Sequence, residues 1–147
     1  MNVRLPVQAF LAWVQEHEER YELVDGRVVM MVGASRNRGL LVLNIAMLLR
    51  NQLGPRTVIA DFGLDAGPRT RRYPDMMVDR TGGDYTTSDP SLLIEVLSPS
   101  SEALDLGDKA AEYLRLPHLA AYIVFAQHEA KAWVWLRTND GFSADRA

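Results

Sequence analysis

An α/β (α+β) fold within one domain is predicted by three features of the sequence. Two apolar runs, 73–79 and 91–97, have the aliphatic composition of buried strands. Asp25-Gly26 lies between two apolar segments and supplies the positive φ angles that a type I′ hairpin turn requires. Residues 35–53 keep the period of an α-helix. The 147 residues suffice for one domain that buries about 70% of its unfolded surface.

The composition excludes several classes of protein. With 48% apolar and 24% charged residues the chain is typical of soluble globular proteins. A net charge of −3 gives no overall basic field, which lowers the expectation of a nucleic-acid partner without excluding a local basic patch. The absence of cysteine excludes disulfides, thiolate zinc sites and a thiol nucleophile. Because we find neither a signal peptide nor an apolar run of about 20 residues, we expect a cytoplasmic protein without a membrane segment.

The N-terminal part is predicted to contain a short amphipathic helix within residues 5–17 and a hairpin over 21–31. Glu22 is the unusual polar residue of the first hairpin strand. A charged residue at the edge of a hairpin is more often solvated than functional, and this is the simpler interpretation of Glu22.

Residues 35–53 form the clearest predicted helix, with Ser35 as its N-cap and Gly54-Pro55 as its end. Its first turn carries Arg36 and Arg38, although cations in this position oppose the helix dipole. Two exposed arginines are the simpler interpretation, and a functional role is the alternative.

The two apolar runs each contain one carboxylate in an unusual place. Asp75 opens the first run directly after a proline, and Glu95 interrupts the second. Glutamate is disfavoured in strands and almost never fully buried without a partner. Glu95 therefore requires a cation, a metal or a set of hydrogen bonds. Two carboxylates on neighbouring strands could hold a hard divalent ion.

Between these elements we expect short strands at 57–60 and 62–65, a basic loop at 67–72, and a polar loop at 79–90. The basic loop contains Arg69, Arg71 and Arg72 and leads directly to Asp75. Such arginines could neutralise phosphates beside a metal site, although a surface loop with a few arginines is common.

A cap-like sequence at 98–102 precedes a predicted helix over about 103–116. Asp105, Lys109 and Tyr113 are spaced four residues apart and so form one stripe at the border of its buried face. The simplest interpretation is a boundary lysine paired with Asp105. Strands are expected at 120–126 and 130–137. The three histidines have no ligand-like spacing, and we interpret them as surface or structural residues: His17, His118 and His128.

Four short motifs together resemble a known family: Tyr21-Glu22-Leu23-Val24-Asp25-Gly26, Pro74-Asp75, Ile94-Glu95-Val96-Leu97-Ser98-Pro99-Ser100, and Lys109 followed by Tyr113. Their order and spacing are similar to those of the bacterial restriction-endonuclease-like family, long catalogued as a domain of unknown function. This family belongs to the PD-(D/E)XK nuclease superfamily. The resemblance covers about residues 10–137, nearly the whole chain.

The resemblance implies a restriction-endonuclease-like mixed central β-sheet flanked by helices. It also implies a metal site formed by Asp75 of the PD motif and Glu95 of the (D/E)XK strand. The superfamily pattern expects lysine where this chain has Leu97, but this branch supplies the lysine from the following helix, where it corresponds to Lys109. Glu22 matches the hairpin glutamate of the family and would assist the site.

The chain departs from the family pattern in three places. Arg38 stands where the family often has histidine at the start of the long helix, and Ile123-Val124-Phe125-Ala126 stands where it often has Trp-Ile-Val-Asp. Family members usually continue with further strand structure after Gly141-Phe142, and we expect a shortened C-terminal edge here. A homodimer is compatible with the resemblance, and a shortened edge would weaken it.

The chemistry implied by the resemblance is metal-dependent hydrolysis of DNA. Asp75, Glu95 and the backbone carbonyl of Val96 would bind Mg²⁺ (or Mn²⁺) through hard oxygen ligands. Lys109 would activate the attacking water, and Tyr113 would orient Lys109 or contact the phosphate. The DNA backbone would be held by five arginines: Arg36, Arg38, Arg69, Arg71 and Arg72.

Three hypotheses from different classes follow from the sequence. The first is a metal-dependent DNA endonuclease, in which Asp75, Glu95 and Lys109 are all intact. The second is a catalytically silent nucleic-acid-binding module, which Arg38 and Ala126 favour. The third is a structural protein in which Glu95 and Lys109 form a buried ion pair. We favour the first hypothesis.

Overall fold

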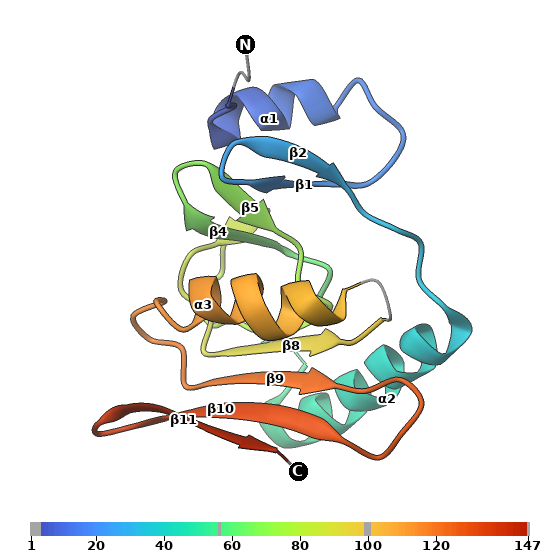
Figure 1. Ribbon diagram of the computed structural model, residues 1–147, viewed down its shortest axis with the longest axis vertical. Coiled ribbons are helices and arrows are strands. Elements are labelled where there is room, and N and C mark those ends of the chain that lie inside the picture. The colour runs from blue at the N-terminus through green and yellow to red at the C-terminus, as the bar shows by residue number, and fades with distance from the viewer. Residues whose placement is uncertain (1–3, 56, 99–100, 147) are drawn as a thin grey trace.

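The computed structural model describes residues 4–55, 57–98 and 101–146 and contains two mixed β-sheets with three helical segments packed around them (Figure 1). The helices are α1 (Val7–Val14), α2 (Arg36–Leu53) and a C-terminal helix that begins as the π-helical segment η1 (Leu104–Asp108) and continues as α3 (Lys109–Tyr113). The strands are β1 (Tyr21–Val24), β2 (Arg27–Met30), β3 (Val58–Ala60), β4 (Gly63–Gly67), β5 (Thr70–Arg72), β6 (Met76–Val78), β7 (Thr86–Thr87), β8 (Leu92–Val96), β9 (Ala121–Phe125), β10 (Ala132–Thr138) and β11 (Gly141–Arg146).

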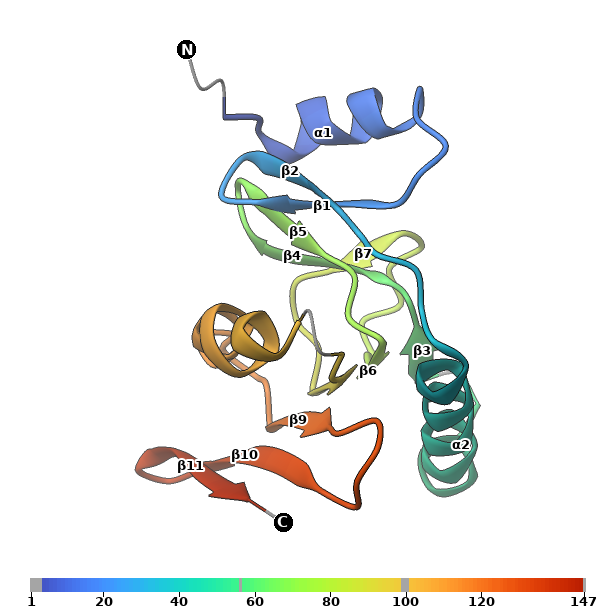
Figure 2. The same cartoon turned by 45° about the vertical axis from the view of Figure 1, so that its right-hand side comes forward.

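The strands divide between two sheets rather than forming one central sheet. The first has the order β2-β1-β5-β4-β7, and the second has the order β11-β10-β9-β8-β6-β3. Each contains one parallel pair, β4 with β7 and β8 with β9, among antiparallel ones. The predicted α/β (α+β) class with mixed sheets and flanking helices is therefore confirmed. Figure 2 shows α1 above the hairpin β1–β2 and α2 beside the six-stranded sheet.

Helices cover both faces of the six-stranded sheet, which explains why its central strands are almost continuously apolar. Alternate residues of β8 point to opposite faces. Leu93 packs with α3 residues such as Tyr113, whereas Ile94 packs with residues of α2 such as Ile45. By the same alternation, Glu95 points to the α3 side. The third apolar cluster, around Phe10 and Leu23, fixes α1 on the hairpin.

Most predicted elements are confirmed with small changes of boundary. The hairpin turns at Asp25 and Gly26, whose φ angles are 47° and 79°. The Ser35 side chain accepts a hydrogen bond from the Arg38 backbone N–H, as expected of an N-cap. Among the described residues, no helix is long and apolar enough to cross a membrane.

The prediction of a loop is wrong for part of two segments. Thr70–Arg72, assigned to the basic loop 67–72, forms strand β5, which pairs with both β1 and β4. The polar loop 79–90 contains the short strand β7. Both segments are too polar for sequence periodicity to reveal a strand. Of the cap-like sequence 98–102, Pro99 and Ser100 lie outside the described residues.

Candidate functional site

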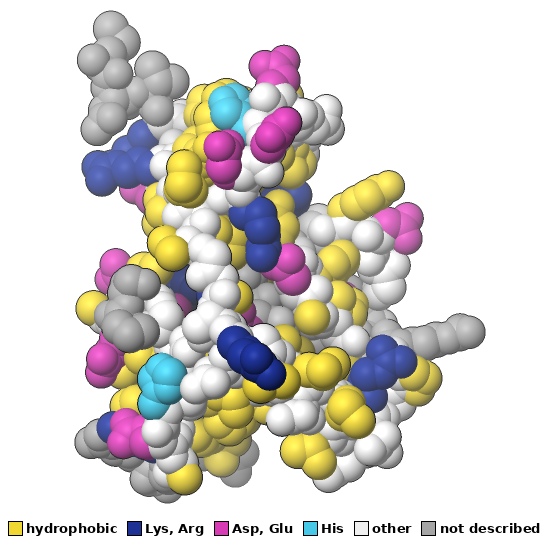
Figure 3. Space-filling model, turned by 90° about the vertical axis from the view of Figure 1, so that its right-hand side faces the viewer, with side chains coloured by type: hydrophobic (Ala, Val, Ile, Leu, Met, Phe, Trp, Pro, Cys, Tyr) yellow, Lys and Arg dark blue, Asp and Glu magenta, His cyan; other side chains and the backbone are white. Residues whose placement is uncertain are grey.

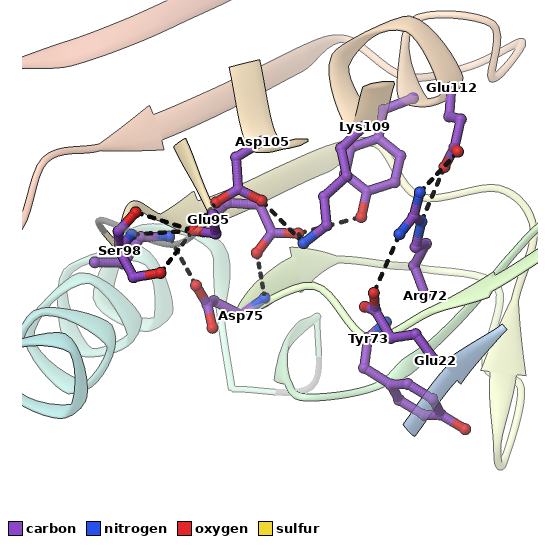
Figure 4. A network of polar contacts seen from close by, with 12 residues as sticks. Glu22, Arg72, Tyr73, Asp75, Glu95, Ser98, Asp105, Lys109 and Glu112 are labelled. Atoms are coloured by element: carbon purple, nitrogen blue, oxygen red, sulfur yellow. Dashed lines mark hydrogen bonds and ion pairs between the residues drawn. The ribbon is translucent and has the colours of Figure 1, made fainter. Parts of the chain in front are cut away.

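The antiparallel pairing of β6 with β8 brings the two unusual carboxylates together. Met76 lies opposite Ile94, so Asp75, one residue before β6, adjoins Glu95. The Asp75 N–H donates to Glu95 Oε2 at 3.4 Å, and the Val96 N–H donates to Asp75 Oδ2 at 2.7 Å. Asp75 and Glu95 are therefore neighbours at one end of the strand pair (Figure 4).

Glu95 is buried, with 1% of its surface exposed, and the helix that follows β8 supplies its partners. Lys109 Nζ donates to Glu95 Oε1 at 3.0 Å, and the Tyr113 hydroxyl donates to the same oxygen at 3.1 Å. Lys109 Nζ also lies 3.0 Å from Asp105 Oδ1. Lys109 is thus a buried member of the cluster and not a boundary residue that reaches solvent.

The helix that carries these groups begins with a π-helical turn. The Lys109 N–H donates to the Leu104 carbonyl, an i to i+5 bond, and the α-helix continues from Lys109. Widened turns of this kind occur often at functional sites. The sequence spacing of Asp105, Lys109 and Tyr113 correctly placed them on one stripe, and the structure turns that stripe toward Glu95.

The electrostatics of the cluster show an excess of negative charge. Burial raises the pKa of Glu95 to about 8; Lys109 opposes this rise, while Asp75 and Asp105 add to it. The pKa of Lys109 is raised because the attraction of Glu95 and Asp105 outweighs the effect of burial. Burial and the charge of Glu95 raise the pKa of Tyr113 well above its usual value, so its hydroxyl keeps its proton as a hydrogen-bond donor.

Arg38 reaches the cluster from the N-terminus of α2. Its guanidinium pairs with Asp75 Oδ1, and both side chains are largely buried. The simpler interpretation of an exposed arginine is therefore wrong for Arg38, whereas Arg36 is exposed on the same turn. The other oxygen of Asp75 accepts the Val96 N–H, so both oxygens are engaged.

Glu22 belongs to a second buried network, and its interpretation as a solvated edge residue is wrong. Arg72 has no exposed surface; its Nη1 donates to Glu22 Oε2 at 3.2 Å, and it binds Glu112 through two hydrogen bonds of 2.8 and 3.0 Å. Glu22 Oε1 accepts the Tyr73 N–H at 2.9 Å. Because β1 pairs with β5 on one side and β2 on the other, Glu22 is not at an edge.

The remaining arginines of the predicted basic loop differ in exposure. Arg71 is buried and binds Asp65 through two hydrogen bonds of 2.7 and 2.8 Å. Arg69 is about half exposed and lies 3.7 Å from Asp25. Arg71 and Arg72 therefore do not form a basic surface beside Asp75, because both lie in strand β5 with their side chains buried in ion pairs.

A cleft of about 530 Å³ opens beside the cluster, and Lys109, Glu22 and Arg38 are among its lining residues. His128, interpreted as a surface or structural residue, also lines this cleft, and the Asn37 amide contacts His128 Nδ1 at 3.1 Å.

Glu112 carried no sequence signal as a partner of Arg72, because the two lie 40 residues apart.

The donor set fits a hard divalent ion in chemistry. Asp75, Glu95 and Asp105 supply carboxylate oxygens, which Mg²⁺ and Mn²⁺ prefer. The buried Asp105 Oδ1 has no hydrogen-bond partner among the described residues, although Lys109 lies close to it. In the arrangement described here, Arg38 pairs with Asp75, and Lys109 is shared between Glu95 and Asp105. No trio of acidic or histidine side chains within the described residues has the geometry of a metal site.

Residues 7–146 match the model of the Uma2 family, described as "Putative restriction endonuclease". The chain belongs to the Uma2 family. This family membership confirms the resemblance found in the sequence motifs, and it covers both sheets and the helix that carries Lys109.

Relatives and solved structures agree with Uma2 membership. The chain is 30% identical over 147 residues to the uncharacterized protein slr1290 of Synechocystis. The alignment covers 94% of this chain and 77% of that protein. It is 29% identical to the uncharacterized protein sll1609 of the same organism, over 84% of this chain and 75% of that one. A crystal structure described as a "putative nuclease belonging to DUF820", from Anabaena variabilis, superposes with a TM-score of 0.75 at 13% identity, over 97% of this chain and 83% of that one. The chain therefore shares the fold of that structure.

Proposed function

We propose that this protein is a metal-dependent endonuclease that hydrolyses phosphodiester bonds in DNA. One observation carries the proposal: Asp75, Glu95 and Lys109 come from a loop, a strand and a helix, yet Glu95 accepts hydrogen bonds from both the Asp75 N–H and Lys109 Nζ, and Lys109 lines the adjacent cleft. Family membership and the nuclease-like fold support it.

In this proposal, Asp75, Glu95 and the backbone carbonyl of Val96 hold Mg²⁺ or Mn²⁺, with Asp105 next to them. When bound, the ion would polarise the phosphate and lower the pKa of a water molecule. The surplus of carboxylates over cations around Glu95 favours a cation at this position. Release of Asp75 from Arg38 frees the carboxylate oxygen that an ion needs.

Lys109 is the group that acts on the reacting atoms. Its ammonium is held between Glu95 and Asp105 and lines the cleft, where it can hold the attacking water and offset negative charge at the phosphate. The water oxygen forms a bond to phosphorus and loses a proton to solvent, the bond from phosphorus to the leaving sugar oxygen breaks, and that oxygen takes up a proton from solvent. Tyr113 and Glu22 are positioning residues: Tyr113 orients Glu95, and Glu22 fixes the hairpin through Arg72.

DNA would be held chiefly by the arginines that keep exposed surface: Arg36, Arg38 and Arg69. Arg38, once released from Asp75, can contact a phosphate beside the cleft. Arg71 and Arg72 are proposed to contribute indirectly, by holding strand β5 in place, because their guanidinium groups are buried in ion pairs.

A second candidate function is a nucleic-acid-binding module without catalysis. The observation that favours it is the pairing of Arg38 with Asp75, which closes the position that a metal would require. A single pair of measurements distinguishes the two functions. Calorimetric titration with Mg²⁺ and Mn²⁺ should show one bound ion that Asp75→Ala removes, and plasmid or oligonucleotide cleavage should require that ion. Binding of DNA without cleavage under any divalent metal would favour the second candidate.

A further inference from the structure

An apolar segment lies at the mouth of the candidate site. Val29 and Met30 end strand β2, and Val32 lies in the connection to α2. Their side chains are exposed, at 44%, 58% and 76% respectively. These three residues line the cleft of about 530 Å³ that also contains Lys109 and Tyr73. An apolar group exposed beside a reactive site marks a surface that contacts a ligand.

The connection from β2 to α2 lies across the entrance to the site. Residues Met31 and Val32, together with Arg38, line both the larger cleft and a second cavity of about 190 Å³. Lys109 belongs to the first cavity and Asp75 to the second. Figure 3 looks onto this side of the molecule, where hydrophobic side chains are mixed with a few cationic ones. A substrate strand that contacts both Lys109 and Asp75 would therefore lie beside this apolar connection.

The dimensions of the cavities favour a narrow ligand. Cavities of 300–1,000 Å³ enclose molecules of the size of a drug or cofactor, and a cleft of about 530 Å³ lies in this range, which suits one flexible strand better than the wider stacked duplex. A duplex also keeps its bases inside the stack, where Val29, Met30 and Val32 could not reach their faces. Unpaired bases expose those faces to apolar and aromatic side chains.

The distribution of charge leads to the same conclusion. Duplex recognition depends on many lysine and arginine contacts to phosphates, but the chain has a net charge of −3. Arg71 and Arg72 are buried in ion pairs, and Lys109 and Arg38 pair with the carboxylates of the site. The exposed side chains at the entrance are instead apolar, which suits contact with bases.

We propose that the segment Val29–Val32 is a base-binding mouth, and that the substrate of this site is single-stranded DNA rather than a duplex. The proposal rests on the proposed nuclease function for the same site. Bases of the unpaired strand pack against Val29, Met30, Val32 and the ring of Tyr73, while the phosphate between them enters toward Lys109 and Arg38.

Binding is measured first, without cleavage, by fluorescence anisotropy in EDTA. The probe is a labelled 12-nucleotide DNA strand, alone or annealed to its complement, with the wild-type protein at two salt concentrations. Single-stranded DNA should bind about tenfold tighter than the duplex. Equal or tighter binding of the duplex overturns the proposal.

A matched pair of double variants then tests the mouth itself. Met30→Ser with Val32→Ser removes side chains that are 58% and 76% exposed, and Met47→Ser with Leu48→Ser removes side chains that are 58% and 64% exposed on α2. Met47 and Leu48 lie about 14 Å further along α2 than Arg38. The first variant should lose about tenfold in affinity for the single strand with an unchanged salt slope, because no phosphate contact is lost. The second should bind like wild type.

Three outcomes would contradict the proposed contact between the base-binding mouth and the unpaired bases. Wild-type affinity in the first variant, or equal losses in both variants, would show that Met30 and Val32 do not contact the strand. A change in sedimentation of the first variant alone would assign the surface to contact between two copies of the chain.

Cleavage of the same oligonucleotides with Mn²⁺ separates this inference from the proposed function. Tight, mouth-dependent binding of the single strand without cleavage would refute the nuclease and leave the base-binding mouth supported. Cleavage of the duplex and the single strand at equal rates would refute the substrate preference and leave the nuclease supported. Neither binding nor cleavage would refute both.

Discussion

Two buried ionic clusters border the same cleft and differ in how completely their oxygens are paired. Around Arg72, both oxygens of Glu22 and both oxygens of Glu112 accept a hydrogen bond. Around Lys109, Glu95 Oε1 accepts two donors, Glu95 Oε2 has only the long contact with the Asp75 N–H, and Asp105 Oδ1 has no hydrogen-bond partner within the described part of the chain.

This difference supports a structural role for the Arg72 cluster and the proposed ligand-binding role for the Lys109 cluster. Arg72 joins β5 to β1 and to α3, so its network holds the five-stranded sheet against α3. In the Lys109 cluster, Asp105 Oδ1 has the ion pair with Lys109 but no hydrogen bond from a described residue, and the pKa of Glu95 is raised to about 8. A cation would relieve this excess of negative charge.

Arg72→Met should cause the greatest loss of stability. The substitution leaves Glu22 and Glu112 without their shared cation, and breaking a buried ion pair from one side costs about 3–5 kcal/mol. Urea denaturation measures the change in the free energy of unfolding. Arg71→Met is the control and should cost less, because its partner Asp65 is 29% exposed and can be hydrated. Equal losses would show that the Arg72 network has no special structural role.

Lys109→Ala should abolish most metal-dependent cleavage while leaving DNA affinity nearly unchanged. A group that stabilises charge developing in the transition state contributes on the order of 3 kcal/mol, or about a hundredfold in rate, whereas one cation contributes only a share of the binding. Single-turnover cleavage beside an anisotropy titration measures both. The matched control is Lys131→Ala, which removes a lysine paired with the exposed Glu129. Parallel losses of rate and affinity in Lys109→Ala would instead assign Lys109 to binding.

The metal-free protein should become less stable as the pH rises from about 4.5 to about 8 because of Glu95. Burial raises its pKa in the folded state to about 8, so in this range the folded protein holds a proton that the unfolded chain has released. The free energy of unfolding then falls by up to about 1.4 kcal/mol per pH unit. The raised pKa of Lys109 keeps it charged throughout this range.

Urea denaturation in EDTA at several pH values tests this expectation, and Glu95→Gln is the reference because it cannot titrate. The difference in stability between wild type and Glu95→Gln should shrink or reverse in favour of the variant as the pH rises. Saturating Mg²⁺ should reduce the slope for wild type only. A pH-independent difference would show that Glu95 stays ionised in the folded protein.

Arg38→Ala should increase affinity for Mg²⁺ severalfold, on the order of 1 kcal/mol. The guanidinium competes with the ion for Asp75 Oδ1, and its removal frees that oxygen. Isothermal titration calorimetry measures the affinity, and Arg36→Ala on the same helical turn is the control. A weaker affinity in Arg38→Ala would mean that Arg38 supports the arrangement of the metal ligands.

Much of the site could be predicted from the sequence because its signals are local. A glutamate inside the apolar run of β8 must be paired, and Asp75 after a proline precedes the neighbouring strand. The four-residue spacing of Asp105, Lys109 and Tyr113 places them on one side of a helix in any helical structure. The hairpin turn and the Ser35 cap depend on adjacent residues alone, and both are found as predicted.

Tertiary structure alone decided the roles of Glu22, Arg38, Arg71 and Arg72. Each is a charged residue that sequence patterns assign to the surface, because long charged side chains are buried only when a partner is present. Those partners are distant in sequence: Arg72 meets Glu22 at a separation of 50 residues and Glu112 at 40, and Arg38 meets Asp75 at 37. From the sequence alone, only Glu95 could be said to need a cation, and the tertiary packing decided which cations Glu95, Glu22 and Glu112 received.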